Sequence, residues 1–383
     1  MSDLRGFSLV LCLVLSITLL SGCSGDIKIG AVISKSGGVA TPYGDRVTKG
    51  MDLALEQVNA AGGVNGGKVT LIYRDDATNP NVGTQVTNEL INEVGVSAII
   101  GAVSSPVTLA MAPICEEAGV VMLSPSSSAN DITNAGDWVF RNWPADQIEG
   151  TAMAKFAKEE VGAERVVIFS ETGSWGQGLA DVFTSQYEGR FRKVEKRFEF
   201  NESTMDQLPA MIEEAKSLSP DACYVVAYDQ ELVQVLKHLD EAGIDTVRMS
   251  TSSVTADIGR RAGTSAENMV YPQVFFDLNS KDPVVAAFIA AYRAKYNEDP
   301  DIYAAHGYDA LKLLAAAIET AGSNHPRSIR QGLSAIENFD GAAGRTSFDS
   351  NGDVVRYPRI YIVRDGQPIA YDELKDQGGS LFD

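Results

Sequence analysis

The chain has 383 residues, which is more than one domain usually holds, so two domains are the starting expectation. Apolar residues make up 44% of the sequence, as in ordinary soluble globular proteins. The formal net charge of −19 argues against a nucleic-acid partner, because nucleic-acid binding requires basic patches that neutralise phosphates.

The N-terminus predicts export. Arg5 precedes an apolar run over residues 7–20, which has the length of a secretory signal and is short for a membrane span. The run ends in Leu20-Ser21-Gly22-Cys23, which resembles a lipobox, where the cysteine becomes the lipidated first residue of the mature protein. We predict a lipoprotein signal peptide over residues 1–22 and a lipid anchor on Cys23 at the outer face of the cytoplasmic membrane. An ordinary signal peptide with an incidental cysteine is the alternative.

The four cysteines fall into two groups. Cys12 and Cys23 belong to the N-terminal segment, whereas Cys115 lies on a helical pattern and Cys223 on a strand pattern, both in apolar surroundings. We interpret Cys115 and Cys223 as buried free thiols. A disulfide between them is the alternative in an exported protein, and it is disfavoured because the two belong to different predicted lobes.

From residue 27 the chain alternates strand-like and helix-like segments. Short apolar runs predict strands, and apolar residues at helical spacing predict helices. The predicted strands of this first series are 27–33, 69–73, 98–101 and 120–123, and the helices are 44–61, 82–94 and 108–118. This alternation indicates a parallel sheet covered by helices on both faces.

A second series of similar size starts after Trp143-Pro144. Its predicted strands are 166–169, 194–198 and 224–227, and its helices are 148–161, 178–187, 208–218 and 231–242. Beyond Asp282 the pattern predicts helices 284–295 and 302–321 and a β-rich tail with a strand near 357–363. Two such series indicate two similar α/β lobes, and the lack of a low-complexity linker indicates tight crossings between them.

Polar and aromatic side chains follow several of the predicted strands. Open parallel sheets bind ligands at the carboxyl ends of their strands, beside helix N-termini. The residues are Ser104, Ser105, Ser126 and Ser128 in the first series, and Trp175 and Tyr228 in the second. Hydroxyls and free backbone N–H groups suit a carboxylate, and the aromatic rings suit an apolar or cationic group. Such serines are also common helix caps, so the prediction depends on their convergence at one sheet edge.

The sequence gives little support for catalysis. His238, His306 and His325 lie far from one another, and no metal-ligand or nucleophile–base spacing surrounds them. The chain shows no phosphate-binding loop and no serine nucleophile elbow, and Asp75-Asp76 has the pattern of a turn. We therefore predict a protein that is not an enzyme and that uses neither a metal nor a cofactor.

In their order and spacing, several stretches between about residues 27 and 363 resemble the branched-chain amino-acid binding family of type I periplasmic binding proteins. They are Gly38-Val39-Ala40-Thr41-Pro42-Tyr43-Gly44, Asn59-Ala60-Ala61-Gly62-Gly63-Val64-Asn65-Gly66, Tyr73-Arg74-Asp75-Asp76, Ile100-Gly101-Ala102-Val103-Ser104-Ser105, Met122-Leu123-Ser124-Pro125-Ser126-Ser127-Ser128, Arg141 with Asp146 and Gly150, Trp175-Gly176-Gln177-Gly178, Tyr308-Asp309-Ala310, and Phe348-Asp349 with Asn351-Gly352-Asp353.

The resemblance implies an α/β fold of two similar lobes, each a parallel-type sheet flanked by helices. Three crossings would join the lobes, near Asp146, Val274 and Pro358. Lobe one would comprise residues 26–145 and 276–357. Lobe two would comprise residues 146–275 and 358–383.

The resemblance also implies roles for single residues. Ser105 and Ser128 match hydroxyl residues that hold the ligand carboxylate, and Ser126 matches a residue that contacts the ligand through its backbone. The aromatic residues that match pocket positions are Tyr43 and Tyr303 from one lobe, and Trp175 and Tyr228 from the other.

One position departs from the family pattern. Ser252 stands where branched-chain members have a glutamate that binds the ligand amine. A buried ammonium without a partner costs several kcal/mol. Either another acid therefore replaces this glutamate, or the solute has no α-ammonium. Asp146, Glu171 and Asp229 are the candidates, and each of them is equally well explained as a helix cap or a turn acid.

The function implied by the resemblance is solute capture. A small solute, an amino acid or a relative, would bind between the lobes of a monomer and pass to an ABC permease complex. A binder of an amide or urea-like solute, a sensory subunit of a signalling receptor and a secreted hydrolase are the alternatives. The receptor is disfavoured by the lack of a fused output domain, and the hydrolase by the lack of a nucleophile–base set.

Overall fold

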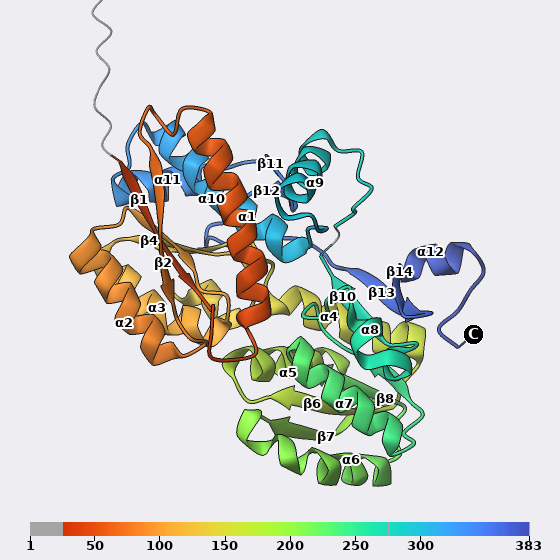
Figure 1. Ribbon diagram of the computed structural model, residues 1–383. Helices are drawn as coiled ribbons and strands as arrows, with labels where there is room; N and C mark the ends of the chain where they lie inside the picture. The colour runs from red at the N-terminus through yellow and green to blue at the C-terminus, as the bar shows by residue number, and fades with distance from the viewer. Residues whose placement is uncertain (1–25, 275, 383) are drawn as a thin grey trace, which may run out of the picture.

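The computed structural model describes residues 26–274 and 276–382, which form two α/β lobes (Figure 1). The predicted signal peptide and the predicted lipidation site Cys23 lie outside the described residues. Each lobe is built around one sheet with helices on both of its faces, as the alternation of segments predicts.

Lobe one contains a parallel sheet of five strands. In spatial order they are β2 (Val69–Asp75), β1 (Ile27–Ile33), β3 (Ala98–Gly101), β4 (Val121–Ser124) and β5 (Val139–Arg141). One face is covered by α1 (Thr41–Ala60) and α10 (Ile302–Ala321), and the other by α2 (Pro80–Glu89) and α3 (Ser105–Ala118). Because both faces are covered, the strands are apolar almost throughout.

Lobe two contains a sheet of seven strands. They are β14 (Gln367–Ala370), β13 (Arg359–Arg364), β10 (Val270–Gln273), β9 (Val247–Met249), β8 (Ala222–Val226), β6 (Arg165–Glu171) and β7 (Lys193–Phe200), in spatial order. β13 pairs antiparallel with both β10 and β14, and the other pairs are parallel. The covering helices are α4 (Asp146–Phe156), α5 (Ser174–Tyr187) and α12 (Tyr371–Asp376) on one face, and α6 (Leu208–Ser217), α7 (Asp229–Glu241) and α8 (Ile258–Ala262) on the other.

The remaining elements are two helices and two short strands of lobe one, and short helical turns in both lobes. They are α9 (Pro283–Tyr296), α11 (Pro326–Ser334), β11 (Phe339–Gly341), β12 (Gly344–Thr346) and the short turns η1 (Leu90–Val94), η2 (Asn130–Asn134), η3 (Ala157–Val161), η4 (Glu202–Gln207) and η5 (Gly263–Ala266). The chain passes between the lobes three times: between β5 and α4, between β10 and α9, and between β12 and β13. The pairing of β13 with β10 supports the predicted residue limits of the lobes, which stay a prediction.

The predicted elements and the observed ones differ mainly at their ends. The strands 27–33 and 98–101 and the helix 302–321 have the predicted bounds. Helices α3 and α5 begin three or four residues earlier than predicted, because their first turns are polar and lack the apolar period. The strands β5, β9, β10 and β14 were not predicted, since three or four residues carry too short a pattern.

Close packing of α1 against α10 depends on two glycines. A Cβ atom at Gly50 would lie 1.9 Å from the carbonyl oxygen of Ala304, and one at Gly307 would lie 2.3 Å from that of Val47. Each helix therefore presents a glycine to the backbone of the other, which brings the two helix backbones together. This contact fixes the N-terminal turns of both helices, which carry residues of the functional site.

Cys115 and Cys223 are buried and free, which confirms the prediction of two free thiols. Within residues 26–274 and 276–382, no helix combines the length and apolar character of a membrane span. The same residues contain no group of three or more histidine, cysteine, aspartate or glutamate side chains arranged to hold a metal ion.

A buried ion pair secures the edge of the first sheet. Arg141 at the end of β5 is fully buried, and its Nε and Nη2 atoms donate to the carboxylate of Asp353 at 2.6 and 2.8 Å. Its other hydrogen bonds go to the carbonyl of Ala129 and the hydroxyl of Thr133. The backbone N–H of Arg141 donates to the carbonyl of Gly352, so the 349–353 segment covers this sheet edge.

We expect Asp353→Ala to reduce the free energy of unfolding by about 3–5 kcal/mol, because the Arg141 guanidinium would stay buried without its carboxylate. Urea or thermal unfolding measures this loss. Asp340→Ala is the control, since it removes an ion pair with Arg345 whose side chains are 61% and 67% exposed. The control should lose no more than about 1 kcal/mol. Equal losses of unfolding free energy for Asp353→Ala and Asp340→Ala would contradict the stabilising role assigned to the buried pair of Arg141 and Asp353.

Candidate functional site

A cavity lies between the two lobes and is lined by the residues that follow their strands. Its lining residues are Tyr43, Val103, Ser105, Ser126, Ser128, Trp143, Trp175, Tyr228, Ser252, Ser253 and Tyr303. Eight predicted site residues line the cavity: Tyr43, Ser105, Ser126, Ser128, Trp175, Tyr228, Ser252 and Tyr303. The predicted residues Ser104 and Asp146 do not line it. The cavity sits at the carboxyl ends of the strands, where open parallel sheets place their ligand sites.

Ser105 is the first residue of α3 and is placed to donate a hydrogen bond into the cavity. Its Oγ accepts the backbone N–H groups of Ser128 and Ala129, both at 3.2 Å. A hydroxyl has two acceptor lone pairs and one proton, so these contacts leave the proton available as a donor. Because the N-terminus of a helix also favours negative charge, this end of the cavity suits an anion such as a carboxylate.

The neighbouring serines have different roles. The Ser126 Oγ donates to the carbonyl of Val103 at 2.9 Å, so its hydroxyl proton is already used in holding two loops together. Ser127 does not line the cavity, and its hydroxyl is hydrogen-bonded to the hydroxyl of Thr108. Ser104 is buried behind the lining residues, and its Oγ has no hydrogen-bond partner within the described chain. Among the serines of these two loops, Ser105 and Ser128 are therefore the cavity-lining residues whose hydroxyl protons are not donated to a backbone carbonyl.

Aromatic rings form a continuous chain around the other side of the cavity. They are, in order of contact, Trp143, Tyr303, Tyr43, Tyr228 and Trp175. Neighbouring ring centroids lie 4.7–5.9 Å apart, within the usual range for aromatic pairs. Trp143 was not predicted from the sequence, although its position just before the first crossing was a usable signal. This wall suits an apolar group, an aromatic group or a cation.

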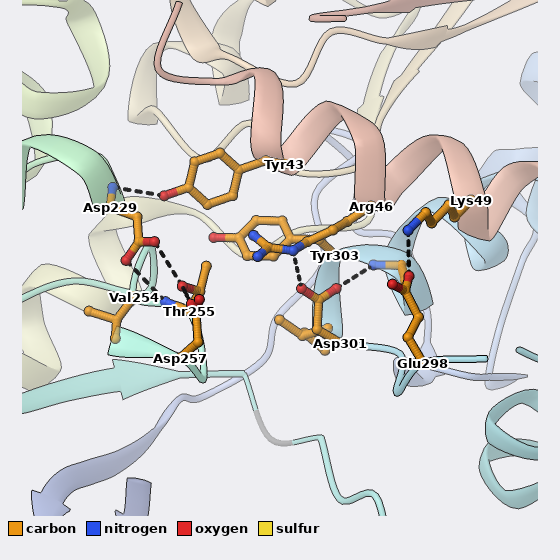
Figure 2. A network of polar contacts seen from close by, with 12 residues as sticks. Tyr43, Arg46, Lys49, Asp229, Val254, Thr255, Asp257, Glu298, Asp301 and Tyr303 are labelled. Carbon is orange, nitrogen blue, oxygen red and sulfur yellow. Dashed lines mark hydrogen bonds and ion pairs between the residues drawn. The ribbon is translucent and has the colours of Figure 1, made fainter. Parts of the chain in front are cut away.

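Two of these tyrosines connect the lobes directly. The Tyr43 hydroxyl on α1 accepts the backbone N–H of Asp229 at 2.9 Å (Figure 2). The same hydroxyl donates to the carbonyl of Ser253, also at 2.9 Å. The Tyr303 hydroxyl on α10 donates to the carbonyl of Ser252 at 3.0 Å. Burial raises the pKa of both phenols, so they remain neutral donors. We call these three hydrogen bonds the tyrosine latch.

The lobe-one side of the latch is held by a second polar group. Asp301 caps α10 by accepting the N–H of Ala304 at 2.9 Å, and it pairs with Arg46 of α1 at 2.9 Å (Figure 2). Asp301 precedes the helical turn that carries Tyr303, and Arg46 lies one turn beyond Tyr43. The pair therefore ties together the two helix ends that carry the latch hydroxyls.

Two of the three acids that were candidate ammonium partners have partners in the protein. Glu171 accepts the backbone N–H groups of Gly173 and Gly176, so it holds the first turn of α5. Asp229 accepts the hydroxyl of Thr255 at 2.8 Å (Figure 2). It also forms an ion pair with Arg261. Glu171 and Asp229 are therefore explained as a helix cap and a turn acid, which was the alternative to binding a solute.

The third candidate, Asp146, differs from the other two. It is fully buried at the start of α4, and neither of its carboxylate oxygens has a hydrogen-bond partner within the described residues. Burial and the neighbouring Glu149 raise its pKa well above the usual value for an aspartate. The nearby side chains of Ser128 and Trp175 lower the pKa of Asp146, but neither forms a hydrogen bond of normal geometry with its carboxylate.

Glu149 is a buried acid that sequence reasoning missed. Its carboxylate accepts both the backbone N–H of Ser252, at 3.0 Å, and the Ser252 hydroxyl, at 2.5 Å. Burial raises its pKa to about 7, and the two Ser252 bonds only partly offset this effect. Its spacing of three residues from Asp146 on a helix was the available signal, because such residues share a face.

Comparison with known proteins gives consistent results. The chain matches the family described as periplasmic binding protein over residues 26–367. The leucine-, isoleucine-, valine-, threonine- and alanine-binding protein of Pseudomonas aeruginosa is 31% identical over 342 residues, covering 88% of this chain and 89% of the relative. The Leu/Ile/Val-binding protein of Escherichia coli K12 is 28% identical and covers 88% of this chain and 93% of the relative.

Solved structures support the same family assignment. A leucine binding protein from Thermotoga maritima has a TM-score of 0.84 at 29% identity, covering 90% of this chain and 97% of that one. A second structure is that of a branched-chain amino acid transporter substrate binding protein from Streptococcus pneumoniae, solved in complex with isoleucine. Its TM-score is 0.81 at 28% identity, and the match covers 90% of this chain and 98% of that one. The chain therefore belongs to the branched-chain amino-acid binding family of type I periplasmic binding proteins.

Proposed function

We propose that this protein is the extracytoplasmic solute-binding component of an ABC importer and that it binds an amino acid in the cleft between its lobes. The observation that carries the proposal is the pairing of the Ser105 hydroxyl at the start of α3 with an aromatic wall contributed by both lobes. The relatives from Pseudomonas aeruginosa and Escherichia coli, both of which are named as binding proteins for leucine, isoleucine and valine, support the same solute class.

Each part of an amino acid has a matching surface in the cleft. The solute carboxylate accepts hydrogen bonds from Ser105 and Ser128 at the N-terminus of α3. The solute side chain packs against the ring wall, where burial of an aliphatic group contributes about 25 cal/mol per Å². A solute of this kind contacts both lobes, because Ser105 belongs to lobe one and Trp175 to lobe two.

Closure follows from contacts that exist only when the lobes meet. The tyrosine latch joins α1 and α10 of lobe one to the 252–253 loop and the start of α7 in lobe two. A solute that touches both lobes adds further contacts to this closed form and none to an open one, so it shifts the equilibrium toward closure. The permease then distinguishes the loaded protein by its closed shape.

A panel of solutes tests the function. L-amino acids, their amides and urea-like solutes are added to the purified protein, and thermal unfolding is recorded. A solute at about 100 times its dissociation constant should add about 2.7 kcal/mol to the free energy of unfolding. We expect aliphatic amino acids to give the largest shift. A shift only with amides or urea-like solutes would replace the proposed solute class, and no shift with any solute would contradict the function.

Tyr43→Phe tests the latch. The variant keeps the ring but leaves the Ser253 carbonyl and the Asp229 N–H without their partner on closure, so solute affinity should fall about 5- to 20-fold. Tyr73→Phe is the control, because the Tyr73 hydroxyl bonds only to Asp52 within lobe one. Calorimetry gives the affinities, and small-angle scattering should show a larger radius of gyration for empty Tyr43→Phe. Unchanged affinity and scattering would refute the latch.

Anchoring through Cys23 is part of the proposal and is supported by the lipobox-like Leu20-Ser21-Gly22-Cys23 sequence. The mature protein should begin at Cys23 and carry lipid on its sulfur. Mass spectrometry of the N-terminal peptide from membrane fractions detects this modification, and Cys23→Ser should abolish it. An unmodified N-terminus in the native protein would show that the segment is an ordinary signal peptide.

A further inference from the structure

The cavity between the lobes is small for a branched-chain amino acid. With the tyrosine latch formed, its volume is about 30 Å³. A buried water molecule needs about 10–15 Å³, so this volume has room for about two or three water molecules. The backbone part of an amino acid already exceeds it. Every further carbon of a solute side chain must therefore displace a wall residue or strain the latch.

Trp143 forms a large part of the lobe-one wall. It stands just before the first crossing, lines the cavity and is 2% exposed. Its indole stacks on the ring of Tyr303, with the centroids 4.8 Å apart and the planes inclined by 18°. The indole also contacts the imidazole of His306, at a centroid distance of 4.6 Å. It thus packs against two residues that lie one turn apart on α10, and it cannot swing away from the cavity without losing both contacts.

His306, which supports the indole, is held as a neutral ring. Its Nδ1 faces the carbonyl of Ile302 at 2.8 Å, and because a carbonyl only accepts, Nδ1 carries the proton. Its Nε2 is then an acceptor and lies 3.3 Å from Nη1 of Arg356. Burial lowers the pKa of His306 to about 3, and the charge of Arg356 acts in the same direction. A buried imidazole with both nitrogens bonded gives Trp143 a fixed support.

The backbone that leads to Trp143 is fixed as well. The N–H of Asn142 donates to the carbonyl of Ser124 at 3.2 Å, which ties this loop to β4. The Asn142 Nδ2 donates to the carbonyl of His306 at 3.0 Å, which ties the loop to α10. Because the indole and its backbone both have fixed partners, a larger solute cannot displace Trp143 without disturbing a closely packed region.

The other aromatic residues of lobe one that line the cavity have a second role. Tyr43 and Tyr303 form the latch through their hydroxyls, so a change in either alters closure as well as space. Trp143 takes no part in the latch. Its volume can therefore limit the solute independently of closure.

We propose that Trp143 sets the size limit of the solute and that the preferred solute is an amino acid with a short side chain, such as alanine. The inference rests on the proposed function and narrows it. A solute of this size disturbs the latch least, whereas the branched side chain of leucine meets the indole. Ser105 and Ser128 bind the carboxylate that both solutes share, so Trp143 acts on the choice between them.

A series of amino acids tests the size limit in the wild type. Calorimetry gives the affinities for glycine, L-alanine, L-valine and L-leucine. We expect L-alanine to bind at least about 10-fold more tightly than L-leucine, because extra carbons overpack a rigid wall. If L-leucine binds as tightly as L-alanine or more tightly, this inference is wrong and the proposed function stands. If no amino acid binds, the proposed function fails as well.

Two variants test the role of the indole. Trp143→Phe and Trp143→Leu both remove volume from the wall, so the affinity for L-leucine relative to L-alanine should rise about 10- to 100-fold, with the larger rise in Trp143→Leu. Trp143→Phe keeps a ring against Tyr303 and His306, which protects the fold. Circular dichroism shows whether each variant is folded, and the wild-type series decides the size limit even if one is not.

Phe288→Leu is the matched control. It shortens a buried aromatic residue of lobe one that does not line the cavity. This variant should lose stability and keep the wild-type ratio of L-leucine to L-alanine affinity. A ratio that stays at the wild-type value in folded Trp143→Phe and Trp143→Leu, or that rises equally in Phe288→Leu, would overturn the assignment of Trp143.

Discussion

A charge that leaves water for a closed cleft must meet a partner of opposite charge or a set of oriented hydrogen-bond donors. This constraint explains the arrangement of the cavity. The anionic side is met by the Ser105 hydroxyl at the start of α3, whose Oγ is already fixed by two backbone N–H groups. At the start of α4, behind this lining, the buried Asp146 has no hydrogen-bond partner for its carboxylate among the described residues.

The fold serves this constraint because parallel sheets collect their loops at one edge. The strands of both lobes end toward the cavity, and every helix that starts there offers either backbone N–H groups or a first-turn side chain. The scaffold behind these loops is rigid: Gly50 and Gly307 bring α1 and α10 into backbone contact, and Arg141 with Asp353 secures the sheet edge. Rigid lobes leave the movement to the crossings, and the tyrosine latch then defines where that movement stops.

The acidic residues around the cleft have similar positions in the sequence but different partners in the folded structure. Glu171, Asp229 and Asp146 all follow a strand and begin or precede a helix, so their local patterns are alike. Glu171 is used by the N–H groups of α5, and Asp229 is neutralised by Arg261 from a helix more than thirty residues away. Asp146 has neither kind of partner and sits beside Glu149 instead. The carboxylate of Glu149 reaches Ser252 from α4 and accepts its hydroxyl.

The sequence by itself determined the alternation of strands and helices, the burial of Cys115 and Cys223, and the lining residues that follow strands, such as Ser105 and Trp175, whereas Tyr43, Tyr303 and Ser252 were implied only by the resemblance to the family. These features are local, since apolar periodicity and the residues after each strand can be read from short windows. Only the tertiary structure decided which serine hydroxyl is free, how Tyr43 and Tyr303 bridge the lobes, and that Trp143 and Glu149 belong to the site. Those properties depend on contacts between residues far apart in the chain: 23 positions for Ser105 with Ser128, 103 for Glu149 with Ser252 and 210 for Tyr43 with Ser253. A hydrogen-bond partner at that separation leaves no trace in a local pattern, because chain folding alone brings the two groups together.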